Sequence, residues 1–338
     1  MQARSRFASV RRGADRLRWR VAVMAFLLAS TLWVVPTAAS ATCGTLQGRI
    51  DRAPAGSVLD LAGCSYRAGA TIAKKLTLKG ATIHVSGQTR AITVAADNVT
   101  LVGLRITGSN SSGFDGRETG VFAQGRAADV PLRNLTIRGC EISSFGGYGI
   151  YMRYVERPII ADTRIHDIVY AGIHVMSGHG GLLIRNRIQR IGVTAADLPG
   201  GGNAYGITLS RIASGDVFRD PPTSDFSVVG NTIEDVPTWH AIDTHAGLRV
   251  SIKGNVVRGA MRAVFVTSDA DGNKSTDVVV SGNLLVAPLP RDNLIAVTIV
   301  DTVGVRVTGN HISTGWRAGV YDYGDSSVDL LVSGNSTP

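Results

Sequence analysis

Lysine, aromatic residues and cysteine are all scarce in this chain of 338 residues. Only five of its 35 basic residues are lysines, aromatic residues make up 6%, and there are three cysteines. Hydrophobic residues still reach 44% while charged residues stay at 18%, which excludes a disordered chain, because such chains are poor in apolar residues and rich in net charge. We find no ligand spacing typical of a metal site and no dedicated cofactor motif.

Long apolar runs are absent except for one near the N-terminus. Residues 21–35 form an apolar stretch of 15 residues, which is shorter than the roughly 20 that a membrane span needs. It follows an arginine-rich segment and precedes the small residues Ala39-Ser40-Ala41, an arrangement typical of a signal peptide. We therefore expect a signal peptide over residues 1–41 and a secreted or periplasmic protein with no membrane contact after cleavage. A retained N-terminal anchor is the alternative.

The leader also carries most of the positive charge. The whole chain has a net charge of +9, and residues 1–41 hold seven Arg and one Asp, so that about +3 remains for residues 42–338. A nucleic-acid-binding surface would need a strong basic patch on the mature protein. We expect no nucleic-acid partner.

A repeat runs along the rest of the chain. Glycine is frequent, with 40 residues, and segments such as VSIKGNVV (250–257) and VVVSGNLL (278–285) recur with a base period of about 22–25 residues, the intervals running from 22 to 28 apart from two longer ones. Units of this length with short alternating strands bury their apolar faces only by stacking. The sequence predicts an all-β fold, a single-stranded right-handed parallel β-helix of about ten coils over residues 42–338. The expected corner positions are Leu104, Cys140, Asp162, Asn186, Asn231, Asn255, Asn283, Asn310 and Asn335.

The corner asparagines and the cysteines have structural interpretations. Asparagine amides stacked at one corner can bond turn backbone and one another, so we expect a ladder and not a ligand site. Cys43 and Cys64 are expected to form a disulfide near the mature N-terminus, and Cys140 to be a buried core residue.

The second strand of each unit carries an unusual outward face. Alternation places Ile150, Ile173, Ile207, Ile242, Val264 and Val320 inside, and the residues after them outside. The outward and adjacent positions concentrate His, Tyr, Arg and Asp, which favours a groove for an extended polymer. Insertions at 109–118, 194–204 and 212–225 are expected to border it. The residues expected to contact substrate are Tyr151, Arg153, His174, Tyr205, Arg211 and Trp239.

The densest polar cluster is the segment WHAIDTH at residues 239–245. In a strand, Asp243 and His245 lie on one face, so the carboxylate can orient the imidazole and raise its basicity.

This segment resembles the Tyr-Gly-Phe-Asp-Pro-His motif of the mannuronan C5-epimerases and the related alginate-lyase-like β-helix proteins. His240 stands at the motif's Tyr, Asp243 at its Asp and His245 at its His, while Asp269 lies near the position of a second family Asp. The resemblance implies a uronate lyase or a C5-epimerase.

Either reaction needs a base, an acid and a group that neutralises the uronate carboxylate. We expect His245, held by Asp243, to be the base and His240 to be the acid, with Tyr205 in reserve. Arg211 or Arg262 would bind the carboxylate.

Two other functions stay open from the sequence. A glycoside hydrolase would use two carboxylates, for which Asp243 and Asp269 form the natural pair. A non-catalytic polysaccharide-binding β-helix would use the aromatic and histidine column only to hold sugar. Asp269 and Asp271 are candidate Ca²⁺ ligands. An open last coil would leave strand edges unpaired, so self-association at the C-terminal end is a further expectation.

Overall fold

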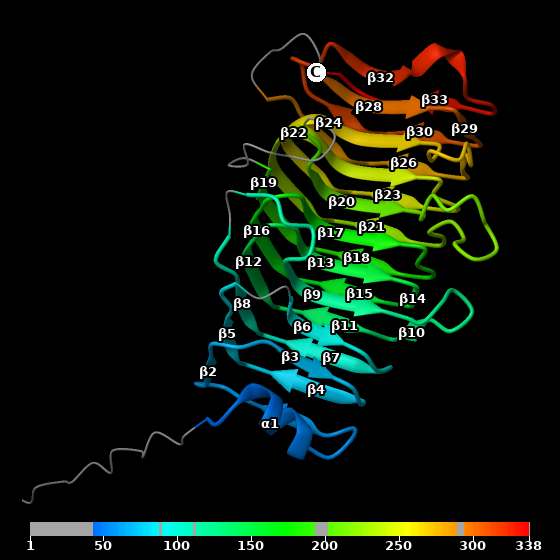
Figure 1. Ribbon diagram of the computed structural model, residues 1–338. Helices are drawn as coiled ribbons and strands as arrows, with labels where there is room; N and C mark the ends of the chain where they lie inside the picture. The colour runs from blue at the N-terminus through cyan, green and yellow to red at the C-terminus, as the bar shows by residue number, and fades with distance from the viewer. Residues whose placement is uncertain (1–42, 88–89, 111–112, 193–201, 289–293, 338) are drawn as a thin grey trace, which may run out of the picture. The chain divides into compact units, whose positions relative to one another are not determined.

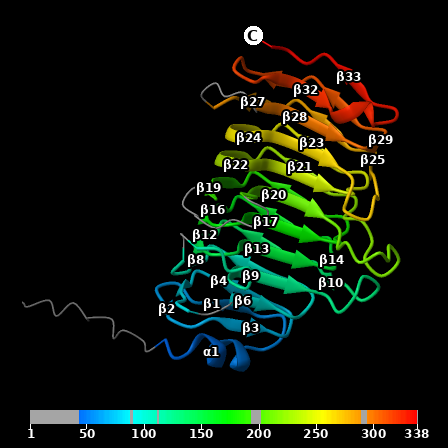
Figure 2. The same ribbon diagram turned by 45° about the horizontal axis from the view of Figure 1, so that its top comes forward.

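The computed structural model describes residues 43–87, 90–110, 113–192, 202–288 and 294–337, so the predicted signal peptide lies outside the described residues. Residues 43–338 form one compact unit. Successive strands of this unit stack as the coils of a parallel β-helix (Figures 1 and 2), and one of its sheets has 11 parallel strands, in keeping with the predicted stack of about ten coils.

Three series of strands run along the stack, and all their pairings among the described residues are parallel. The first series is β1 (Val58–Asp60), β4 (Leu76–Lys79), β7 (Val99–Val102), β11 (Thr136–Arg138), β15 (Ile159–Ala161), β18 (Leu182–Ile184), β21 (Ser227–Val229), β23 (Ser251–Lys253), β26 (Val279–Ser281), β30 (Arg306–Thr308) and β33 (Leu331–Ser333). The second series is β2 (Ser65–Tyr66), β5 (Thr82–His84), β8 (Arg105–Thr107), β12 (Glu141–Phe145), β16 (Arg164–Ile168), β19 (Arg187–Ile191), the first parts of β22 (Thr232–His245) and β24 (Val256–Thr267), β27 (Leu284–Val286) and β31 (His311–Ile312).

The third series carries the predicted outward face. It consists of β3 (Ala70–Ile72), β6 (Arg90–Val94), β9 (Thr119–Gln124), β13 (Tyr148–Arg153), β17 (Ala171–Met176), β20 (Tyr205–Ser210), the second parts of β22 and β24, β28 (Ile295–Val300) and β32 (Ala318–Asp322). Short pairs complete the coils: β10 (Leu132–Arg133) with β14 (Val155–Glu156), and β25 (Ser275–Thr276) with β29 (Thr302–Val303). A 3₁₀ turn, η2 (Tyr323–Asp325), follows β32.

The core is a column of aliphatic side chains inside the coils. The predicted inward residues Ile150, Ile173, Ile207, Ile242 and Val264 pair in register and are fully buried. Full burial of such a side chain stabilises the fold by about 1.5–3 kcal/mol. Because alternate residues of a strand face opposite sides, this inward row fixes which residues face the groove.

An asparagine ladder closes one corner of the stack, as predicted. The backbone N–H of Asn186 donates to Oδ1 of Asn231 at 2.9 Å, and the Asn186 amide donates to the Ile160 carbonyl at 2.9 Å. The same pattern continues through the later corner residues Asn231, Asn255, Asn283, Asn310 and Asn335.

One predicted corner position was wrong by one residue. Thr163, not Asp162, precedes Asn186 in the ladder, since its N–H donates to the Asn186 Oδ1 at 3.1 Å. Asp162 occupies the preceding turn position with a φ of 51°, where later coils carry glycine. Its carboxylate binds Arg185 instead, with Nε and Oδ1 separated by 2.7 Å.

The two ends of the stack differ. Helix α1 (Leu46–Arg52) begins at the N-cap Thr45 and buries Leu46 and Ile50 against the core. The predicted disulfide joins Cys43 to Cys64, and Cys140 is a buried free thiol, as expected. At the other end, β33 pairs with β30 and its side chains are exposed, so self-association there stays a prediction.

Candidate functional site

The outward residues of the third series line up across successive coils. Tyr151, His174, Thr208, Asp243 and Phe265 pair in register from one strand to the next. The sequence analysis overlooked two coils of this column, where β9 contributes Phe122 and β28 contributes Thr298.

Asp243 lies at the centre of the column between two imidazoles. Its Oδ2 makes a short contact with Nδ1 of His240, and its Oδ1 lies 2.9 Å from Nε2 of His245. The side chain of Asp243 is 0% exposed, whereas that of His245 is 32% exposed. The predicted Asp243–His245 neighbourhood is therefore present, and only its histidine end reaches the surface.

The surroundings set the charge of this pair. Burial alone would raise the pKa of the Asp243 carboxyl group, but the charge of His245 and the hydrogen bonds from both imidazoles outweigh it, so that this pKa lies below its usual range. Burial also opposes protonation of His245, but the charge and hydrogen bond of Asp243 dominate and the pKa of the imidazole is raised.

His240 does not occupy the place expected of a proton donor to substrate. Its side chain is 1% exposed and is stacked between Trp239 and Phe265, with ring centroids 4.6 Å and 4.2 Å away. Its Nε2 lies 3.3 Å from Nη1 of Arg262, and burial lowers its pKa. Both ring nitrogens of His240 therefore face protein groups, Asp243 and Arg262, which makes it a less suitable acid than expected; the assignment stays a prediction.

Arg262 is the cation nearest this centre. Its guanidinium lies 5.4 Å from the ring centroid of Trp239 and 5.5 Å from that of Phe265. No carboxylate of the described residues lies within ion-pair distance of it, and burial lowers its pKa. The group is half-buried, so it carries a positive charge that an incoming anion can meet.

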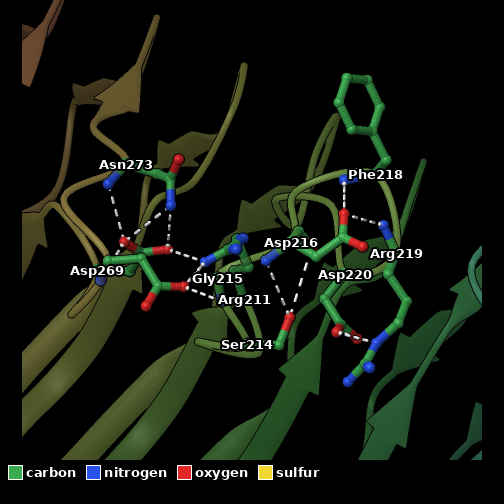
Figure 3. Close-up of polar contacts among 10 residues, drawn as sticks. Arg211, Ser214, Gly215, Asp216, Phe218, Arg219, Asp220, Asp269 and Asn273 are labelled. Atoms are coloured by element: carbon green, nitrogen blue, oxygen red, sulfur yellow. Dashed lines mark hydrogen bonds and ion pairs between the residues drawn. The ribbon is translucent and has the colours of Figure 1, made fainter.

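Arg211 pairs with carboxylates of the protein itself. Its guanidinium Nη1 lies 2.5 Å from Asp269 and 2.7 Å from Asp271, and its side chain is fully buried (Figure 3). The Asp269 carboxylate also accepts hydrogen bonds from the backbone and the amide of Asn273.

These contacts bear on three expectations. Arg211 binds two protein carboxylates through Nη1, while its Nε and Nη2 are buried without a hydrogen-bond partner among the described residues, so its binding of a substrate carboxylate stays a prediction. Asp269 is not a free catalytic acid, because Arg211 and Asn273 bind its carboxylate. Asp269 and Asp271 both bind the Arg211 guanidinium, and the described residues contain no cluster of three or more His, Cys, Asp or Glu that could hold a metal, so the Ca²⁺ considered from sequence gains no support here.

Aromatic side chains continue the column toward the N-terminal coils. Tyr148, Tyr170 and Tyr205 follow one another edge to face, with centroids 5.5 Å apart at each step, and His174 packs beside Tyr148 and Tyr151. Nε2 of His174 lies 3.0 Å from Oγ of Ser210, and burial lowers the pKa of His174 to about 4.

Tyr151 also borders a cavity of about 270 Å³ that contains Arg90, Arg117 and Phe122. The sequence analysis missed these three residues. The segment TGVFAQ of β9 has the small-then-aliphatic pattern used for the other coils, so aligning it on Val121 would have found Phe122.

The predicted insertions are only partly described. In 109–118, Phe114 packs edge to face on Tyr170 at 5.4 Å, so this insertion borders the aromatic column. The 212–225 loop is tied to the site through Arg211 and Gly215, whose N–H donates to Asp271 at 2.8 Å. It also holds Arg153, whose guanidinium lies 3.6 Å from the buried Asp220 carboxylate. Most of 194–204 lies outside the described residues.

Comparison with known families decides the architecture. The sequence profile described as "Right handed beta helix region" matches residues 83–285. The chain belongs to the right-handed β-helix family. This membership confirms the predicted handedness and the expected fold class. No curated protein matches the chain in sequence. No helix in the part of the chain that the structure describes is both long and apolar enough to cross a membrane.

Solved β-helix structures are similar in fold. PfbA, a surface adhesin of Streptococcus pneumoniae, has a TM-score of 0.53 at 13% identity over 79% of this chain and 63% of its own. A GH136 lacto-N-biosidase from Eubacterium ramulus has a TM-score of 0.50 at 14% identity over 81% and 51%. A mannuronan C-5 epimerase A-module from Azotobacter vinelandii has a TM-score of 0.40 at 17% identity over 86% and 94%.

The chain therefore spans less than two thirds of the adhesin and of the biosidase. At such identities the likeness extends to the fold alone. The activity must be argued from the side chains of the site.

Proposed function

We propose that this β-helix protein is an exported enzyme that removes the proton beside the carboxylate of a uronate residue in an extended polysaccharide, as a lyase or a C5-epimerase. The observation that carries the proposal is the contact between the fully buried Asp243 and the partly exposed His245. A buried carboxylate that orients a surface imidazole is an arrangement suited to a general base.

The hydrogen bond assigns the two nitrogens of His245. Nε2 faces Oδ1 of Asp243 at 2.9 Å, so the neutral imidazole carries its proton on Nε2 and donates it to the carboxylate. Nδ1 is the nitrogen that does not face Asp243, and in this proposal it accepts the substrate proton once the imidazole gives up its contact with the Ser268 backbone, which also raises its pKa. As the imidazole becomes charged, the nearby carboxylate stabilises it, which is the source of the raised pKa.

The other two roles fall to Arg262 and Tyr205. Arg262 has no carboxylate partner among the described residues, so its charge is available to the uronate carboxylate. Burial, reinforced by the charge of Asp243, raises the pKa of Tyr205, so its phenol stays protonated and can donate. In elimination, His245 takes the C5 proton, the C4–O bond breaks and the leaving oxygen takes the phenol proton; in epimerisation, C5 receives a proton on its opposite face.

The hydrolase alternative has less support. Its two carboxylates would need a free oxygen toward the sugar. Both Asp243 oxygens contact histidines, and Asp269 is bound to Arg211 and Asn273. We therefore rank proton abstraction above glycoside hydrolysis.

The test uses a panel of acidic and neutral polysaccharides with three readouts: ultraviolet absorbance of unsaturated uronate, new reducing ends, and exchange of the C5 proton with deuterated solvent. Absorbance indicates elimination, exchange alone indicates epimerisation, and reducing ends without absorbance indicate hydrolysis. If a polysaccharide binds but none of the three readouts changes, the protein binds sugar without catalysis and the proposal is overturned.

Variants assign the base on whichever polymer reacts. His245→Ala should lower turnover by about 10²- to 10⁴-fold, and Asp243→Asn should cost less, because the imidazole remains. The exposed His311 in β31 supplies the control His311→Ala, which should react normally. The rate should rise with pH to a midpoint above the ordinary value for histidine, since the neutral imidazole is the active form and its pKa is raised. A severe Asp243→Asn with a mild His245→Ala would contradict this assignment.

A further inference from the structure

A second cavity lies beyond the C-terminal ends of β13 and β17, where the chain turns away from the groove. It has a volume of about 290 Å³, and its lining includes Pro131, Val155, Ser177, His179, Pro221 and Ser224. Two loops, one between β9 and β10 and one between β20 and β21, project from this edge of the stack in both Figures 1 and 2 and supply its prolines. The volume is close to the lower end of the range of about 300–1,000 Å³ for small-molecule sites.

Ser177 in the wall of this cavity has an unsatisfied hydroxyl group. The residue is 5% exposed, and its Oγ has no hydrogen-bond partner among the described residues. Leaving a buried hydroxyl unpaired costs about 1–3 kcal/mol. The turn does not need the hydroxyl, because Ala246 holds the equivalent position two coils further on, with a φ of 55° against 50° for Ser177.

His179 in the same wall is held in one orientation. Its Nδ1 lies 3.0 Å from Oγ of Ser224 and 3.2 Å from Oδ2 of Asp225. Asp225 is in turn held by two contacts from Arg249 at 2.6 and 2.7 Å. Nε2 is left without a partner among the described residues and can bond a ligand.

The proline-bearing loop is fixed by its own contacts before any ligand arrives. The fully buried Asp220 accepts from Arg219 Nε at 3.0 Å and makes a short contact with the Tyr154 hydroxyl. Asp216 accepts from two backbone N–H groups of the loop, and Arg211 ties its base (Figure 3). A wall that is already ordered loses little entropy when a ligand binds.

The charges around the cavity select the ligand class. The lining contains one carboxylate, Glu156, which is already paired with Arg133 at 2.7 Å and with Arg157. No unpaired charge of the described residues therefore lines the cavity, while the prolines and Val155 supply an apolar surface. Hydroxyl-bonding groups opposite an apolar surface suit a ring with polar edges and C–H faces.

We propose that this cavity binds one neutral pyranose unit, with Ser177 and His179 bonding its hydroxyls and the prolines packing on its ring. The site is separate from the His245 centre, and the proposal does not depend on the activity assigned there. It predicts recognition of a neutral sugar, either a branch or a chain end, beside the groove.

The test measures binding of methyl β-D-glucopyranoside, methyl β-D-galactopyranoside and methyl α-D-mannopyranoside to the purified protein by calorimetry and ligand-observed NMR, with methyl β-D-glucuronide as the charged counterpart. At least one neutral glycoside should bind with a Kd in the millimolar range, and the glucuronide should bind more weakly. Ser177→Ala should weaken binding by about threefold to tenfold, the worth of one hydrogen bond. His179→Ala should do the same, while the half-buried Ser251 in β23 supplies the control Ser251→Ala.

The melting temperature of Ser177→Ala should match or exceed that of the parent, because an unpaired buried hydroxyl is removed. The proposal is overturned if no neutral glycoside binds, if the glucuronide binds best, or if Ser177→Ala and His179→Ala bind like the parent. An ordered water as the only occupant of the cavity in a glycoside-soaked crystal would overturn it too.

Discussion

The asparagine ladder allows a stability prediction that can be worked from its hydrogen bonds. Oδ1 of the fully buried Asn255 accepts from the backbone N–H of Asn231 at 2.9 Å and from its amide at 3.0 Å. Asn255→Ala removes that acceptor and leaves the Asn231 N–H unpaired inside the stack. An unpaired buried group costs about 1–3 kcal/mol and the lost side-chain volume adds to it, so we expect a loss of about 2–4 kcal/mol in the free energy of unfolding.

The last residue of the ladder is the matched control. Asn335 makes the same contact to the backbone of Asn310 at 2.9 Å, but it lies at the half-buried end of the stack where water can replace it. Asn335→Ala should therefore cost about 1 kcal/mol or less. Urea unfolding measures both losses, and amide hydrogen exchange at Asn231 and Asn310 localises them, since a repeat array can open in parts. Equal losses at both positions, or no loss for Asn255→Ala, would refute the hydrogen-bond reasoning.

Two further predictions concern buried charge. Arg211→Met should lower the free energy of unfolding by about 3–5 kcal/mol, because Asp269 and Asp271 lose their cation. Amide hydrogen exchange in the 212–225 loop should also become faster. Exchange rates equal to those of the parent would show that other contacts hold the loop. Burial lowers the pKa of His174 to about 4. As the pH falls from about 6.5 to 4, His174 therefore becomes protonated in the unfolded chain but stays neutral in the folded chain. Stability should drop by about 3 kcal/mol over this window, and His174→Gln should remove that part of the pH dependence measured by thermal unfolding.

The stacking of coils could be predicted from sequence because it depends on a local pattern repeated many times. The alternation of apolar residues predicted the inward column of side chains, and the Gly-Asn pair in each repeat predicted the corner of the coil. The exceptions have physical causes. The coil that begins at Asn283, 28 residues after Asn255, continues through β28. Its segment IAVTIV carries neither an aromatic nor a charged outward residue, so nothing in the sequence indicated that this strand belongs to the column. Helix α1 begins at the capping residue Thr45, and because it lies outside the repeat, the repeat pattern does not predict it.

The site could be predicted only as far as strand periodicity reaches. Asp243 and His245 are two residues apart in β22, so they share a face. His240 is three residues from Asp243 and should face the other way in a regular strand, yet its Nδ1 contacts the Asp243 carboxylate, which strand alternation alone does not predict. The partners of Arg211 lie in a loop about sixty residues away, where no periodicity gives a direction.

The arrangement of charges supports His245, and not His240, as the proposed base. Burial is the main cause that lowers the pKa of His240, and the positive charge of Arg262, 3.3 Å from its Nε2, lowers it further. His240 therefore stays neutral and donates from Nδ1 to Asp243 without cancelling its charge. The full negative charge of Asp243 is left to act on His245, whose pKa it raises. The guanidinium proposed to receive the substrate carboxylate therefore also helps burial to keep the inner imidazole neutral.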